Sequence, residues 1–109
     1  MAKTQTDSAF VQFTSMAYGY RAAFVLLRTY RTKYGCNTIR KIINRWAPPK
    51  ENNTEAYIRH VSEWSGIEPD KLIAGQDANA YIKIVAAMSR VENGVEANME
   101  EVVQGWRMA

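Results

Sequence analysis

The residues with the clearest potential for chemistry lie around a proline-rich turn. Trp46 and Tyr57 flank this turn, and Glu51, Asn52 and Asn53 lie between them. Sugar-binding sites combine flat rings, which pack against the apolar faces of pyranoses, with amides and carboxylates that orient the hydroxyl groups. The pattern therefore predicts a groove for a hydroxyl-rich ligand. The alternative is structural: the rings belong to the core, and the polar residues keep a turn soluble.

Two carboxylates are candidates for catalysis, Glu51 in the turn and Glu92 near the end of a predicted helix. Cleavage of a glycosidic bond uses an acid of raised pKa, often beside a second carboxylate. An anion near a helix C-terminus is mildly unfavourable, so Glu92 is expected to have a basic partner. Arg21, which follows "YGY", is a candidate to pair with a buried carboxylate or to bind an anionic ligand. The alternative for each of the three is a solvent-exposed surface charge, which is the more common role of such residues.

The chain has one cysteine, Cys36, and one histidine, His60. An internal disulfide is therefore excluded, and the two residues supply too few ligands for a zinc site. Cys36 is predicted to be a small buried residue without a catalytic role, because His60 lies on a different predicted helix. No phosphate-binding loop and no Ser-His-Asp arrangement is recognisable. We expect neither a metal nor another cofactor.

Composition indicates one globular domain. The 109 residues are 47% apolar and 23% charged, with a net charge of +3. Because no run of basic residues occurs, we expect no nucleic-acid partner. No segment resembles a signal peptide, and no apolar run approaches the ~18 residues of a membrane span. We expect a protein made in the cytoplasm that does not enter a membrane.

Five helices are expected to position these residues. The first covers about 16–34, with Ser15 as its cap and Gly35 as its stop. The other four start at capping residues and end at prolines, glycines or the last apolar residue. The second helix starts at Asn37 or Thr38 and stops at Pro48–Pro49, and the third starts at Asn53 or Thr54 and stops at Gly66. The fourth starts at Asp77 and stops at Gly94, and the fifth starts at Asn98 and stops at Trp106.

Apolar residues recur at helical spacing along these segments. The clearest face consists of Ile39, Ile42, Ile43 and Trp46. Three further aromatic or apolar residues are placed on apolar faces near helix ends: Tyr34, Trp64 and Met99. Residues 1–9 are polar and expected to be loose, and "FVQF" predicts a short extended arm. The expected fold is mainly α: a compact bundle of about five helices within a single domain, residues 10–109.

Several motifs of this chain resemble a family of bacteriophage and prophage virion structural proteins of lysozyme-like character. The motifs are "FVQF", "YGYRA", "TIRKIINRWAPP" and "ENNTEAYI", and the resemblance extends from Phe10 to about Trp106. It implies the helical part of a lysozyme-like fold and association with a virion in a bacterial host. It also implies peptidoglycan or another glycan as a partner, besides other phage structural proteins.

The family pattern opens with an Asn-Pro-x-Asn-Ile-Arg segment and a Trp-x-Gly element, and this sequence has neither. The catalytic glutamate of lysozyme-like folds commonly lies in the N-terminal part, so the resemblance assigns that role to no residue here. Two hypotheses follow. The first is a peptidoglycan-associated, lysozyme-like domain with weak or no lytic activity. The second is a non-enzymatic helical module for assembly of a phage particle or mobile element.

Overall fold

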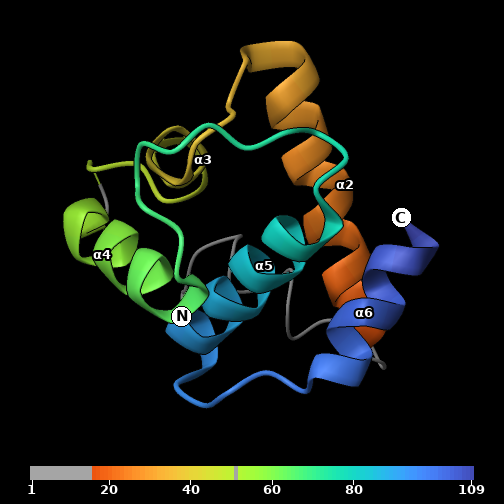
Figure 1. The fold of residues 1–109 in the computed structure, drawn as a ribbon. Coiled ribbons are helices and arrows are strands. Elements are labelled where there is room, and N and C mark those ends of the chain that lie inside the picture. The colour runs from red at the N-terminus through yellow and green to blue at the C-terminus, as the bar shows by residue number, and fades with distance from the viewer. Residues whose placement is uncertain (1–15, 51) are drawn as a thin grey trace.

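The computed structural model describes residues 16–50 and 52–109, and these residues form five α-helices (Figure 1). In chain order the helices are α2 (Met16–Tyr34), α3 (Ile39–Trp46), α4 (Thr54–Ser65), α5 (Ala78–Asn93) and α6 (Met99–Met108). No strand occurs among the described residues, and the predicted mainly α class is confirmed. The segment 1–9, the extended arm and the Ser15 cap lie outside the described residues.

Four of the helices start at side-chain caps. In each, a side-chain oxygen accepts a hydrogen bond of 3.1 or 3.2 Å from the backbone N–H three residues later. The first turn of a helix has N–H groups without helical partners, and the cap supplies an acceptor for one of them. The capping residues are Thr38, Asn53, Asp77 and Asn98. Where the sequence left two candidates, the structure therefore selects Thr38 and Asn53.

Gly35 ends α2 as predicted. Its φ of 67° lies in the left-handed region, which glycine adopts without steric cost. The Gly35 N–H donates to the Arg31 carbonyl and the Cys36 N–H to the Tyr30 carbonyl, each at 3.1 Å. This pair of bonds closes the last turn and directs the chain toward α3.

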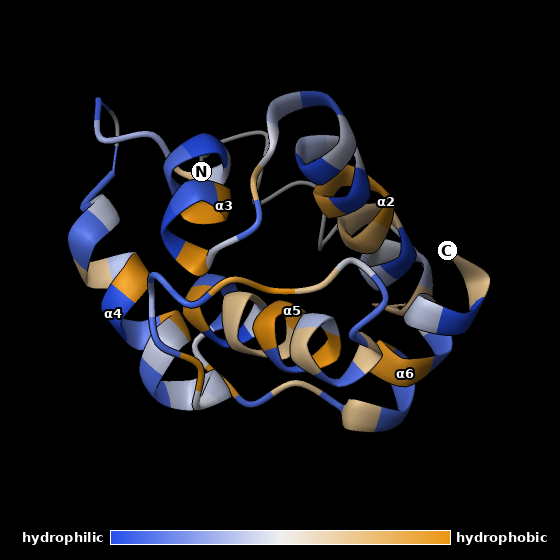
Figure 2. Ribbon diagram, turned by 45° about the horizontal axis from the view of Figure 1, so that its top comes forward, coloured by the Kyte–Doolittle hydropathy of each residue, from blue (hydrophilic) through white to orange (hydrophobic). Residues whose placement is uncertain are grey.

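Helix α5 lies at the centre of the molecule, between α4 and the pair formed by α2 and α6 (Figure 1). α4 packs mainly against α5, and α2 mainly against α6. The buried face of α5 carries Tyr81, Ile84, Val85 and Met88, at the spacing of one helical stripe. Figure 2 shows the same amphipathic pattern, with hydrophobic and hydrophilic residues alternating around each helix.

The segment between α4 and α5 has no helix, but it is tied to the helices it crosses. The Ile73 N–H donates to the Asn37 carbonyl at 2.9 Å, and the Arg40 N–H donates to the Pro69 carbonyl at 3.0 Å. Arg31 Nη1 donates to the Ile73 carbonyl at 2.9 Å. These bonds hold the segment against the end of α2 and the start of α3, as its path in Figure 1 shows.

Three residues predicted on apolar faces are exposed instead. The exposed fractions are 48% for Tyr34, 39% for Trp64 and 47% for Met99. All three lie at or near a helix end, where the neighbouring helices cover less of the surface. Two of the rings are partly covered by arginine: Arg45 lies 3.5 Å from the centroid of Tyr34, and Arg90 lies 4.1 Å from that of Trp64.

Candidate functional site

Trp46 is the last residue of α3 and is only 5% exposed. Its position follows from the apolar face that it shares with three isoleucines, Ile39, Ile42 and Ile43, all of them fully buried. The two prolines after Ala47 prevent the helix from continuing. The indole therefore lies in the core, with its N–H pointing to groups from two other helices.

Those groups are Tyr57 of α4 and Glu92 of α5. The Trp46 Nε1–H donates to the Tyr57 hydroxyl at 3.0 Å and to Glu92 Oε2 at 3.3 Å. The Tyr57 hydroxyl donates to the same Glu92 oxygen at 2.8 Å. Tyr57 is 8% exposed, and Glu92 is partly buried. The structure thus joins three predicted site residues into one polar cluster, which connects α3, α4 and α5.

The cluster gives Glu92 a role in helix packing. Two neutral donors, the Tyr57 hydroxyl and the Trp46 N–H, face one of its carboxylate oxygens and connect α5 to α4 and α3. Trp46 and Tyr57 are also buried, so their ring faces are not presented to solvent. The arrangement suits a structural contact between three helices.

The turn after Pro48 is held by its own side chains. Asn52 Nδ2 donates to the Pro48 carbonyl at 3.1 Å, and Asn53 Oδ1 accepts from the Ala56 N–H at 3.1 Å. The buried Thr54 hydroxyl donates to the Ala47 carbonyl. Glu51 lies outside the described residues. Asn52 thus has a structural role that its sequence context did not indicate, and ligand binding by these residues remains a prediction.

Arg21 has a partner outside the cluster. It lies exposed on α2, and its Nε donates to the Met108 carbonyl near the end of α6 at 3.1 Å. This bond gives no evidence that Arg21 is the basic partner expected for Glu92. Its predicted role in binding an anionic ligand remains a prediction.

A second buried polar link lies one turn before Glu92 and was not predicted. The Tyr20 hydroxyl and Ser89 Oγ lie 2.9 Å apart, and Asn93 Nδ2 donates to Ser89 Oγ at 3.2 Å. Burial raises the pKa of Tyr20, while the bond to Ser89 lowers it and the charge of Glu101 raises it further. The available signal was the polar stripe Ser89, Glu92 and Asn93, at i, i+3 and i+4 on an amphipathic helix.

Cys36 and His60 lie apart from the cluster. Cys36 is 6% exposed and belongs to the hydrophobic core. His60 stacks on Trp64 with ring centroids 5.1 Å apart, and its Nδ1 is buried without a hydrogen-bond partner among the described residues. Within residues 16–50 and 52–109, no three His, Cys, Asp or Glu side chains are grouped closely enough to hold a metal ion. In the same residues, no helix is both long and apolar enough to cross a membrane.

Comparison with known proteins finds similarity to a protein of a bacterial virus. Over 88 residues, 81% of this chain, it is 40% identical to Protein P5 of Pseudoalteromonas phage PM2. This chain is similar to a bacteriophage protein. It spans about half the length of Protein P5, 53%. No family model matches the chain. The phage part of the resemblance is thereby confirmed, whereas the similarity does not address lysozyme-like character or an additional N-terminal segment.

Proposed function

We propose that this chain is a helical domain of a bacteriophage structural protein, and that it acts by binding rather than by catalysis. The similarity to a phage protein supports the first part. The hydrogen bonding of Glu92 supports the second, because its Oε2 accepts from both the Tyr57 hydroxyl and the Trp46 N–H. A carboxylate held in this way connects three helices, and this structural role accounts for its position without catalysis.

Lytic activity is the direct test. The purified chain, added to a suspension of purified cell walls, is expected to leave the turbidity unchanged over hours. Glu92→Gln and Glu51→Gln are expected to behave as the unsubstituted chain does. Clearance by the unsubstituted chain that disappears in one of these variants would identify a catalytic acid and overturn the proposal.

Association with peptidoglycan is the second proposal, and it rests on the resemblance to lysozyme-like phage proteins and on the amides after Pro48. Asn52 uses its Nδ2 and Asn53 its Oδ1 in the bonds described above. The other amide atom of each remains available to a sugar hydroxyl. Because the rings of Trp46 and Tyr57 are buried, such contacts would be polar and weak.

One titration separates glycan binding from an assembly role. Muropeptides or N-acetylglucosamine oligomers are added to ¹⁵N-labelled protein, and the backbone amides are followed by NMR. Shifts concentrated at residues 50–57 would support a glycan contact there. A stable oligomer in sedimentation velocity, with no shifts at millimolar glycan, would instead support a module for particle assembly.

A further inference from the structure

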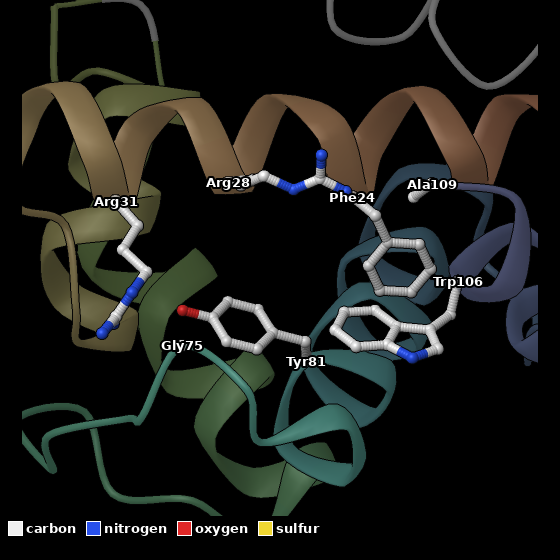
Figure 3. A pocket seen from close by; sticks show the side chains of 7 residues that line it. All are labelled: Phe24, Arg28, Arg31, Gly75, Tyr81, Trp106 and Ala109. Atoms are coloured by element: carbon white, nitrogen blue, oxygen red, sulfur yellow. The ribbon is translucent and has the colours of Figure 1, made fainter.

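A pocket of about 230 Å³ lies between α2, α6, the start of α5 and the segment before it. Figure 3 shows its lining, with Phe24 and two arginines from α2, Gly75, Tyr81 of α5 and Trp106 of α6. It is separate from the cluster around Glu92 and shares no residue with it. The pocket combines an apolar part and a cationic part, and each part has a distinct structural basis.

The apolar part is made by three rings. Phe24 meets Trp106 edge to face, with centroids 5.2 Å apart and planes at 81°. Tyr81 lies nearly parallel to Trp106, with centroids 6.2 Å apart and planes at 15°. Both geometries are favourable for aromatic pairs, so the rings form a defined wall. A flat apolar group of a ligand would find matching surfaces here.

The cationic part consists of Arg28 and Arg31, three residues apart on the same side of α2. Among the described residues, neither arginine forms a salt bridge with a carboxylate. Within residues 16–50 and 52–109, the hydrogen bond that Arg31 donates is to the Ile73 carbonyl, at 2.9 Å. A Cβ at Gly75 would lie 2.5 Å from Arg31 Nε, so the absence of a side chain there lets the guanidinium lie against the segment. Among the described residues, two arginines without a carboxylate within 4.0 Å thus line one small pocket.

The Tyr81 hydroxyl is the observation that points to a ligand. Tyr81 is 4% exposed, and its buried hydroxyl has no hydrogen-bond partner among the described residues. Buried hydroxyls are normally paired, and an unpaired one is destabilising. In Figure 3 the hydroxyl points along the pocket toward the side where Arg31 and Gly75 lie. The charged side chains that line the pocket, Arg28 and Arg31, are donors, so an acceptor oxygen of a ligand would suit them and the hydroxyl together.

We propose that this pocket binds a small carboxylate attached to a flat apolar group. A carboxylate offers two acceptor oxygens in one plane, which suits a guanidinium fork and a phenol hydroxyl together. The size fits: a cavity of about 150 Å³ holds a benzene ring, and this pocket adds room for a carboxylate. The site is independent of the function proposed above.

Phenylacetate is the probe, and its binding is followed by NMR of the ¹⁵N-labelled protein. We expect shifts at the amides of residues 28–31, 75, 81 and 106, and an affinity at least tenfold above that for 2-phenylethanol, which has the ring but no charge. Equal affinities for the two probes would overturn the cationic assignment. Tighter binding of phenyl phosphate than of phenylacetate would overturn the choice of a carboxylate.

Two substitutions test the residues. Tyr81→Phe removes only the hydroxyl, and it is expected to weaken phenylacetate binding about tenfold. Because that hydroxyl is unpaired in the free protein, the midpoint of unfolding should be unchanged or higher. Arg28→Gln should weaken binding about fivefold, whereas Arg59→Gln, which removes an exposed charge from α4, should not. Unchanged binding in Tyr81→Phe, or a lower midpoint, would overturn the assignment of the hydroxyl.

Discussion

The Tyr57 hydroxyl donates a hydrogen bond of 2.8 Å to Glu92, a residue 35 positions later in the chain. Trp46 Nε1 donates to both groups, at 3.0 Å to Tyr57 and 3.3 Å to Glu92. Each of the three side chains comes from a different helix. The polar cluster therefore acts as a specific contact between α3, α4 and α5 inside an otherwise apolar interface.

This relationship predicts energetic coupling between Tyr57 and Glu92. In a double-mutant cycle of Tyr57→Phe and Glu92→Gln, the coupling free energy should be about 1–2 kcal/mol, measured by urea denaturation. The reason is that the bond joins a hydroxyl to a charged acceptor away from bulk water. Pairing Tyr57→Phe with Glu63→Gln, an exposed residue of α4, is the control and should give less than about 0.5 kcal/mol. Equal coupling in both cycles would show that the bond contributes nothing specific.

The two tryptophans of α3 and α4 should differ in their contribution to stability. Trp46 is 5% exposed and Trp64 is 39% exposed. Trp46→Ala leaves a large cavity and should lower the free energy of unfolding by about 3–5 kcal/mol. Trp64→Ala loses only surface contacts with His60 and Arg90 and should cost about 1 kcal/mol or less. A denaturation midpoint of Trp46→Ala indistinguishable from that of the unsubstituted protein would contradict this.

Gly105 should be intolerant of any side chain. A Cβ at this position would lie 2.6 Å from Tyr20 Cβ and 2.9 Å from the Ala17 carbonyl oxygen. Alanine is intrinsically better than glycine in a helix by about 1 kcal/mol, yet Gly105→Ala should lower stability by about 1–3 kcal/mol because α6 must move away from α2. Gln104→Ala, at the exposed neighbouring position, is the control and should change stability by less than about 0.5 kcal/mol. A stabilising Gly105→Ala would show that the helix contact is looser than described.

Stability should fall at alkaline pH, in part through Tyr20. Burial raises the pKa of Tyr20 above the ordinary value of 10.0. Above that pH the unfolded chain loses this proton while the folded protein keeps it, so the free energy of unfolding decreases as pH rises through the pKa of the folded state. Tyr20→Phe should make the decrease between pH 9 and 11 shallower. Tyr18→Phe, at a position 53% exposed, should leave the decrease in stability unchanged. If the unsubstituted protein, Tyr20→Phe and Tyr18→Phe lose stability equally over this pH range, the decrease does not come from Tyr20.

The helices of this protein are predictable from the sequence because their ends are local. A cap such as Asn53 bonds to a backbone group three residues away, and Gly35 closes its helix with bonds spanning four to six residues. The apolar faces are equally local, since a spacing of three or four residues defines a helical stripe. The five helices therefore follow from short stretches of chain.

The candidate site is only partly predictable. Trp46, Tyr57 and Glu92 each stood out in the sequence by residue type and position. No local pattern indicated that Glu92 would receive bonds from the other two, because the three residues are brought together by the packing of separate helices. The bond from Asn52 Nδ2 to the Pro48 carbonyl is local, but the residue types alone do not determine the turn conformation that allows it.

Exposure and pocket formation depend entirely on the tertiary structure. The same helical spacing places Trp46 in the core and Trp64 at the surface, because neighbouring helices cover one helix end and not the other. The pocket beside Tyr81 needs α2, α6 and the segment before α5 to meet, and its residues extend from Phe24 to Ala109. Contacts between such distant positions arise from the way helices pack, so the sequence by itself determined the helices, and only their packing decided where a ligand can bind.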